Sequence, residues 1–211
     1  MRRLHSFERA AWDGGAQYIC GVDEVGRGPL AGPVAACAIV IAKPLHIEFL
    51  NDSKVVTSLR RAQLADSIRS DAICFALGWA TPQEIDRVNI LAATKLAMSR
   101  AIASLARPPC QVFVDALSIP DCPYPQQAIV DGDAKSAAIA AASIVAKVAR
   151  DAHMAMLDAL HRGYGFAHNK GYGTAAHLAA LAKHGPCPEH RRSFAPVMAP
   201  TLALAYDGDI V

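Results

Sequence analysis

Ten consecutive residues without a single charge, 137–146, limit the fold of this chain more than any other feature. They open a stretch, 136–161, that has the composition of one long helix. A helix that is apolar on every side has to be buried nearly all round. The rest of the chain must therefore supply elements that cover the first half of this helix.

Strands and further helices are predicted on both sides of that stretch. Apolar, often β-branched runs that end at acidic or turn residues predict five strands, at 18–23, 34–41, 73–80, 111–115 and 127–130. Helical spacing predicts helices at 59–70 and 90–105, and Thr81, Pro82 and Glu84 form the expected cap of a short helix. We expect the first two strands to pair as a hairpin. The order predicts an α/β fold, a mixed sheet with helices on both faces.

Length and composition limit the class of protein. The chain has 211 residues, with 53% hydrophobic and 19% charged residues, which favours one folded domain and excludes a mainly disordered chain. The longest apolar run, 34–42, is nine residues, whereas a membrane-spanning helix needs about 20. The first residues lack the apolar stretch of a secretory signal. Six cysteines without a C-x-x-C pair predict a reducing, cytoplasmic compartment and no zinc site.

Acidic residues follow three of the predicted strands. Asp23 and Glu24 close the first strand and precede a Gly-Arg-Gly turn, Asp115 ends another strand, and Asp133 lies between the fifth strand and the long helix. Taken alone, Asp23 and Glu24 could cap a turn or lie in solvent. Their use together requires the chain to turn, because neighbouring residues of a strand point to opposite faces. A nucleotide-binding loop is disfavoured, because the glycine spacing is one residue too long and no G-K-[ST] motif is present.

Four acids that converge at one edge of a sheet would repel one another by several kcal/mol unless cations are present. Their oxygen ligands favour Mg²⁺ or Mn²⁺ over zinc. Sites of this kind typically carry out in-line displacement at phosphorus with two metal ions. The sequence therefore predicts a two-metal site formed by Asp23, Glu24, Asp115 and Asp133.

A basic segment lies near the end of the chain. Between residues 160 and 200 there are five Lys or Arg residues and one acid, although the formal net charge of the whole chain is only +2. The blocks 168–174 and 190–194 combine basic, aromatic and small residues, as contact with phosphate and stacking on bases require. A solvated surface is the alternative, which we favour for Lys183. If four of the 19 acidic residues bind metal, 21 basic residues face 15 remaining acidic ones. The low net charge of the chain therefore does not argue against a polyanionic partner.

The chain resembles the type 2 ribonucleases H, in particular bacterial ribonuclease HII, over nearly its whole length. The resemblance rests on five ordered motifs: Gly-Val-Asp-Glu-Val-Gly-Arg-Gly-Pro-Leu from residue 21, Leu-Asn-Asp-Ser-Lys at 50–54, Ala-Ala-Ser-Ile-Val-Ala-Lys-Val-Ala-Arg-Asp at 141–151, Lys-Gly-Tyr at 170–172 and His-Arg-Arg-Ser-Phe at 190–194. It implies a ribonuclease H-like fold, with a five-stranded mixed sheet flanked by helices and a C-terminal helical region. It also implies one catalytic domain over 1–211, with its core at about 17–197 and flexible ends.

The resemblance also assigns roles to residues. The family's metal-binding acids fall on the same four positions, Asp23, Glu24, Asp115 and Asp133. Gly26, Arg27, Gly28 and Tyr172 are implied to read the ribose 2′-hydroxyl at an RNA-to-DNA junction, which is the group that distinguishes RNA from DNA. Other basic residues are implied to bind the substrate: Lys54, Lys170, Arg191 and Arg192. For Lys147 and Arg150 we favour internal packing over contact with the substrate.

Two positions depart from the family pattern. Ala116 follows the third acid where the family usually has glycine, and a glycine there can serve a positive φ or a close approach. Asp131 lies before the fourth acid where the family commonly has lysine, which changes the local charge by two. These departures concern metal affinity and turnover, but not the identity of the four acids.

The resemblance implies an endoribonuclease that cuts the RNA strand of RNA-DNA hybrids and nicks 5′ to ribonucleotides in duplex DNA, leaving 3′-hydroxyl and 5′-phosphate ends. We expect a monomer that acts on nucleic acid and not on membranes. The alternative is a hybrid-binding protein that has lost catalysis, which the presence of all four acids disfavours. A type 3 ribonuclease H shares the acids but has an extra N-terminal domain, for which the 22 residues before Asp23 are too few.

Overall fold

The computed structural model describes residues 4–45 and 57–198. Among these residues, five strands form one mixed sheet in the order β3-β2-β1-β4-β5. β1 is antiparallel to β2 and parallel to β4, so the predicted hairpin is confirmed. β2 pairs antiparallel with β3, and β4 pairs parallel with β5. The strands are β1 (Ile19–Val25), β2 (Val34–Ile41), β3 (Cys74–Ala80), β4 (Gln111–Asp115) and β5 (Gln126–Ile129).

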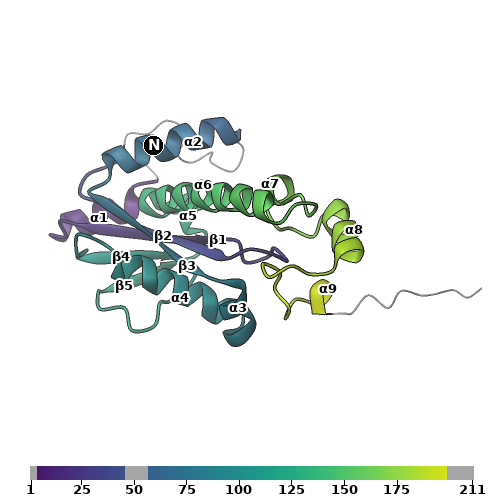
Figure 1. Cartoon of the computed structure of the whole chain (residues 1–211). Helices are drawn as coiled ribbons and strands as arrows, with labels where there is room; N and C mark the ends of the chain where they lie inside the picture. The colour runs from purple at the N-terminus through teal and green to yellow at the C-terminus, as the bar shows by residue number, and fades with distance from the viewer. Residues whose placement is uncertain (1–3, 46–56, 199–211) are drawn as a thin grey trace, which may run out of the picture.

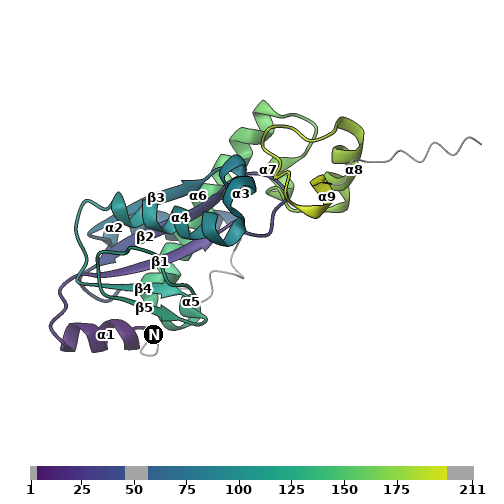
Figure 2. The same ribbon diagram turned by 90° about the horizontal axis from the view of Figure 1, so that it is seen from below.

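Helices cover both faces of the sheet, as predicted (Figure 1). α6 (Ala137–Leu160) and α2 (Ser58–Asp71) lie on one face, together with α1 (Ser6–Asp13). α4 (Ile90–Ala103) packs on the other face, and α3 (Pro82–Val88) precedes it. Figure 2 shows the remaining C-terminal helices gathered beyond one end of the sheet. They are α7 (Phe166–Asn169), α8 (Ala175–His184) and α9 (Ala195–Met198), and α5 (Gly132–Lys135) lies between β5 and α6.

The charge-free half of α6 is buried, which confirms the prediction from residues 137–146. It packs against β1 and β2, and its alanines allow a close approach. Gly21 of β1 faces the backbone of Ala138, and a Cβ atom at residue 21 would overlap that backbone. The small residues on both elements therefore set the distance between the helix and the strand that ends in the acids.

Local signals at the predicted short helix are also confirmed. Thr81 Oγ1 accepts a hydrogen bond from the Glu84 N–H at 3.2 Å, and Glu84 Oε2 accepts one from the Thr81 N–H at 2.9 Å. These two bonds form a complete capping box at the start of α3. Within the described ranges, none of the helices is both long enough and apolar enough to span a bilayer.

Candidate metal and nucleic-acid site

The predicted acids gather at the carboxyl ends of β1 and β4, which are parallel neighbours. Asp23 is 5% exposed and lies within β1, while Asp115 is the last residue of β4. The Asp115 Oδ1 atom accepts a hydrogen bond from the Gly132 N–H at 2.7 Å, and this brings the start of α5 and its Asp133 to the same edge. The charges of Asp23, Glu24 and Asp115 thus interact at this edge of the sheet, and Asp133 follows directly after the Gly132 amide that Asp115 accepts from.

β1 extends two residues beyond the strand end that was predicted at Asp23, so Glu24 lies within the strand. β1 continues to Val25, so Asp23 and Glu24 pair in register with Cys37 and Ala36 of β2. Strand alternation then places Glu24 on the opposite face from Asp23. The Glu24 carboxylate lies 3.3 Å from Arg27 Nη1, and it is still close enough to Asp115 to interact with its charge.

The electrostatics of the acids indicate a site whose negative charge is only partly offset by Arg27. Burial raises the pKa of Asp23 well above its ordinary value, and the Glu24 and Asp115 carboxylates raise it further. A hydrogen bond from the Glu24 N–H to Asp23 Oδ1 at 2.7 Å opposes this effect, as does one from Ser143 of α6. Burial also raises the pKa of Glu24, although Arg27 opposes the increase.

The donor set fits a divalent cation. The Glu24 Oε2 atom is buried and has no hydrogen-bond partner, and the Glu24 carboxylate interacts with the charge of Asp115 as well as with Arg27. Hard cations such as Mg²⁺ and Mn²⁺ take oxygen ligands of this kind. Nowhere in 4–45 or 57–198 do three His, Cys, Asp or Glu side chains already form a metal-binding group. Asp115 instead accepts a hydrogen bond from the Gly132 N–H, and Glu24 forms an ion pair with Arg27. A bound cation would compete with these two partners for the carboxylates.

The glycine turn after β1 contacts two buried arginines, Arg150 and Arg191. Gly26 has a φ of +94°, and a Cβ atom there would overlap the Arg150 side chain. Arg150 donates from Nε to the Pro33 carbonyl at 3.0 Å and from Nη1 to the Lys170 carbonyl at 3.0 Å. Internal packing of Arg150, which we favoured from the sequence, agrees with this arrangement.

Arg191 differs from its predicted role. Its side chain is 0% exposed and donates to the carbonyls of Gly26, Arg27 and Gly32. A guanidinium that is fully buried and donates four hydrogen bonds to main-chain carbonyls is not accessible to a phosphate in this structure, which argues against the predicted contact of Arg191 with the substrate. Burial lowers its pKa to about 9, and the nearby Arg150 contributes, so it remains a cation at neutral pH.

The remaining predicted contacts lie on the surface around the turn. Tyr172 is 44% exposed, and a Cβ atom built on Gly28 would lie 3.7 Å from Tyr172 Cε1. Arg27 is exposed beside them, and Lys170 is partly exposed. Arg192 is exposed, while its backbone N–H donates to Asp86 Oδ2 at 2.9 Å. Lys54 lies outside the described residues.

Both departures from the family pattern have a structural counterpart. Ala116 has a φ of +50° directly after Asp115, which is the conformation that a glycine would adopt without strain. Asp131 also has a positive φ, +53°, and its carboxylate lies 3.7 Å from Lys135 Nζ on the surface. Lys135 therefore offsets part of the negative charge that Asp131 adds.

Some residues that support the site were not predicted from the sequence. Asp86 of α3 accepts hydrogen bonds from the backbone N–H groups of Arg192 and Ser193, both at 2.9 Å, and from the Ser193 hydroxyl at 2.6 Å. Glu8 of α1 is fully buried and accepts a hydrogen bond from the Ala138 N–H at 3.0 Å at the start of α6. Each partner lies more than 100 residues away, so no local pattern could have indicated these bonds.

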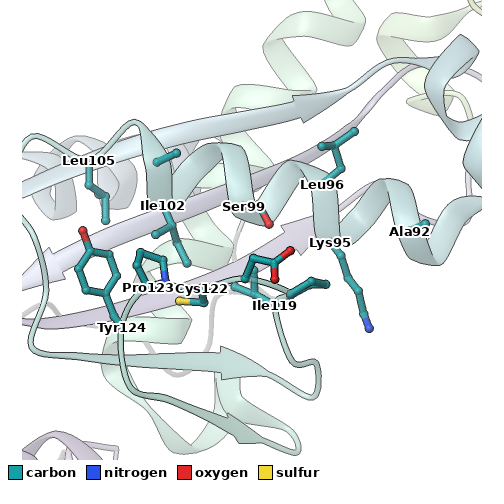
Figure 3. Close-up of a pocket in the computed structure, with 13 residues that line it drawn as sticks. Ala92, Lys95, Leu96, Ser99, Ile102, Leu105, Ile119, Cys122, Pro123 and Tyr124 are labelled. Carbon is teal, nitrogen blue, oxygen red and sulfur yellow. The ribbon is translucent and has the colours of Figure 1, made fainter.

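A separate cavity of about 540 Å³ lies between α4 and the connection from β4 to β5 (Figure 3). Its wall is mostly apolar and includes Ile102, Ile119, Cys122 and Tyr124. None of the predicted site residues lines this cavity, so its size does not make it the candidate site.

Comparison with known proteins gives consistent matches. The family model for ribonuclease HII matches residues 20–197. Proteins named ribonuclease HII from Desulfitobacterium hafniense and Moorella thermoacetica are 53% and 50% identical to this chain. The first match covers 90% of this chain and 73% of the relative, and the second covers 92% and 94%.

Solved structures have the same fold. The ribonuclease H2 of Pyrococcus horikoshii OT3 matches with a TM-score of 0.70 and 27% identity, over 86% of this chain and 95% of that one. A Bst-RNase HIII structure in complex with Mn²⁺ matches with a TM-score of 0.69 and 18% identity, over 93% of this chain and 70% of that one. At this identity the match shows the shared fold alone.

Proposed function

The chain belongs to the ribonuclease HII family and is thus an endonuclease of the ribonuclease H type, and we propose that it nicks duplex DNA on the 5′ side of an embedded ribonucleotide. We propose that it also cuts the RNA strand of RNA-DNA hybrids, and that both reactions leave 3′-hydroxyl and 5′-phosphate ends. The observation that carries the proposal is that interacting carboxylates at the sheet edge are joined to the Gly26–Gly28 turn through the contact of Glu24 with Arg27 at 3.3 Å, while Gly28 of the same turn lies beside Tyr172.

Asp23, Glu24, Asp115 and Asp133 are proposed to hold two divalent cations, Mg²⁺ or Mn²⁺. When bound, such cations supply Lewis acidity at the attacking water and at the departing 3′-oxygen. The protein contributes the placement of its acids. The Gly132 N–H orients Asp115, and the Glu24 N–H orients Asp23. The buried, unpaired Glu24 Oε2 supports a cation at this edge.

The substrate surface is proposed to consist of the Gly26–Gly28 turn, Tyr172 and exposed basic residues. Gly28 and the ring of Tyr172 lie side by side, so the turn is proposed to contact the ribose and Tyr172 the sugar of the following deoxynucleotide. Arg27, Lys170 and Arg192, and by resemblance Lys54, would contact phosphates, which position the duplex but do not read its sequence. We further propose a single catalytic domain over 1–211 that acts as a cytoplasmic monomer. The compartment is proposed because the six cysteines include no C-x-x-C pair, a usage typical of reducing environments.

Cleavage of a DNA duplex that contains one ribonucleotide tests this function. We expect one cut on its 5′ side with Mg²⁺ or Mn²⁺, and no cut in the all-DNA duplex or after chelation. Asp115→Asn is the matched variant, because it preserves the shape of the side chain and removes its charge. If the wild type binds the duplex and metal but leaves the ribonucleotide strand intact, the proposal fails and a non-catalytic binding protein is favoured. Calorimetric titration of both proteins with Mn²⁺ measures the metal separately.

A further inference from the structure

Two buried histidines connect separate parts of the proposed substrate surface. His177 of α8 and His190 are 0% and 1% exposed, and their Nε2 atoms lie 3.1 Å apart. At one end of this pair, His177 Nδ1 lies 2.9 Å from the Tyr172 carbonyl oxygen. At the other end, the Cys187 N–H donates to His190 Nδ1 at 3.1 Å. A chain of three hydrogen bonds thus leads from Cys187 to Tyr172.

The two ends of this chain fix the position of every proton in it. The Cys187 amide can only donate, so His190 Nδ1 must accept and its proton must lie on Nε2. The Tyr172 carbonyl can only accept, so His177 must carry its proton on Nδ1. His190 Nε2–H then donates to the bare Nε2 of His177. All three bonds are made only when both rings are neutral and hold these two opposite tautomers.

The backbone of His190 lies against the segment that follows the glycine turn. His190 forms an isolated antiparallel bridge with Ala31. On either side of it, the Gly32 N–H donates to the Glu189 carbonyl at 2.9 Å, and the Arg191 N–H donates to the Leu30 carbonyl at 2.8 Å. The main chain of His190 is therefore fixed to the turn segment, while its ring reaches Tyr172 through His177.

Aromatic rings hold both imidazoles in place. The Tyr164 ring lies 4.9 Å from the His190 ring between centroids, and the Phe166 ring lies 5.5 Å from the His177 ring, edge to face. Tyr164 and Phe166 stack on each other at 5.4 Å. Rotation of either imidazole would require these rings to move, so the hydrogen bonds have a single rigid geometry.

We propose that His177 and His190 are positioning residues that set the spacing between Tyr172 and the Gly26–Gly28 turn, and thereby the preference of the enzyme for a single ribonucleotide followed by DNA. This inference rests on the proposed function, in which Tyr172 and the turn contact neighbouring sugars. The pair touches neither the substrate nor the acids. It acts through the carbonyl of Tyr172 on one side and the bridge to Ala31 on the other.

The surroundings of His190 keep its ring neutral. Burial lowers the pKa of His190 to about 4, and the nearby His177, Arg192 and His161 also disfavour its charged form. The Cys187 Sγ atom lies 3.2 Å from His190 Nδ1. At neutral pH the network is therefore intact, as a positioning device for catalysis requires.

Two substitutions of His177 separate positioning from packing. His177→Asn keeps a donor near the place of Nδ1, so it can still bond the Tyr172 carbonyl, whereas His177→Phe keeps a ring but has no donor. The measured quantity is kcat/KM on a duplex with one ribonucleotide divided by kcat/KM on an RNA-DNA hybrid. We expect this ratio to fall about tenfold in His177→Phe, the effect of one lost hydrogen bond at a positioned group. In His177→Asn it should stay within about threefold of the wild type.

An unchanged ratio in His177→Phe overturns the proposal, and so does an equal fall in both variants. If His177→Phe does not fold, His190→Gln replaces it, because the Gln amide can still donate to His177 but cannot accept from Cys187 through the same atom. Its ratio should lie between the wild type and Tyr172→Ala. A ratio equal to that of the wild type would show that the tautomer chain is not what positions Tyr172.

A second measurement does not depend on activity. Nitrogen-15 NMR of the histidine rings in the full chain at pH 7 should show two neutral imidazoles, His177 protonated on Nδ1 and His190 on Nε2. A charged ring, or the reverse tautomers, overturns the proposal even if the enzyme cleaves as proposed. If the tautomers are as expected but no ribonucleotide is cut, the proposed function fails while the geometry of the pair stands.

Discussion

The Nη2 atom of Arg191 donates to the carbonyl of Gly26, two residues beyond Glu24, from a fully buried position. Replacing Arg191 by Met removes several donors at once and leaves the carbonyls of Gly26 and Gly32 buried without their partners. We expect the free energy of unfolding to fall by about 3–5 kcal/mol, as measured by urea denaturation.

Arg192→Gln is the matched control for that experiment, because Arg192 is adjacent but exposed. It should change stability by less than about 0.5 kcal/mol. Its effect should instead be on substrate binding: the KM of the variant should exceed that of the wild type at low salt. The difference in KM should shrink as the salt concentration rises, because a phosphate contact releases counterions. Equal destabilisation by the two substitutions would contradict the structural role of Arg191.

Asp23→Asn should stabilise the metal-free protein while it abolishes catalysis. Asp23 is buried beside Glu24 and Asp115, and its raised pKa shows that the charged form is unfavourable in the fold. The amide removes that charge, so the free energy of unfolding at pH 7 should rise by about 1 kcal/mol. Activity should fall at least about a hundredfold, because a proposed metal ligand is lost.

The pH dependence of that effect has a definite sign. A carboxyl whose folded-state pKa is raised contributes stability below its unfolded pKa and loses it as the pH rises through the folded value. Without metal, the wild type should therefore lose stability relative to Asp23→Asn as the pH rises from about 4 toward neutrality. Added Mg²⁺ should reduce this difference in stability between the wild type and Asp23→Asn, because a cation offsets the charge of the Asp23 carboxylate. Thermal denaturation with and without Mg²⁺ measures both trends.

Ala116→Gly should stabilise the protein. Ala116 has a φ of +50°, which costs an L-residue about 1 kcal/mol relative to glycine. The melting temperature should rise by about 2–4 °C. Ala155→Gly on the exposed side of α6 is the control and should lower it, because glycine is unfavourable within a helix. A fall in both variants would mean that Ala116 is not strained.

Acid should weaken the C-terminal helical region through His190. Its pKa in the fold is about 4, below the ordinary value of 6.5, so the unfolded chain binds the proton more readily between these values. Stability should therefore fall as the pH drops from about 6.5 to 4, by up to roughly 3 kcal/mol for this group. Hydrogen exchange of the α8 amides at pH 7 and pH 5 measures the change. His190→Gln, which has no titrating ring, should remove most of it.

Local signals were sufficient to predict much of this fold. The capping box at Thr81 and Glu84 and the hairpin from β1 to β2 depend on residues close together in the chain, and both are confirmed. The alanine-rich start of α6 was predicted to be buried because it offers no polar face. α1 was not predicted, because its position depends on Glu8 and the distant start of α6.

The same distinction explains what could be predicted of the site. Acids that follow strands indicated a common edge, and Asp23 and Asp115 do interact there. Arg191 and Arg192 look alike in sequence, yet one is buried and the other exposed. That difference depends on the turn at Gly26 and on Asp86, which lie far from both arginines in the chain. The tautomers of His177 and His190 likewise follow only from contacts across several elements.

The late position of α6 in the chain has a consequence for biosynthesis. All five strands leave the ribosome before residue 137, but α6, which packs against β1 and β2, follows them. A nascent chain that stops near residue 135 would have α1 and α2 on this face and would lack α6, so part of the core cluster that contains Ile19 and Ile39 would stay open to water. Such intermediates are prone to aggregate and to recruit chaperones. Because α6 packs against β1, the acids at the end of β1 acquire a fixed geometry only after α6 has been translated.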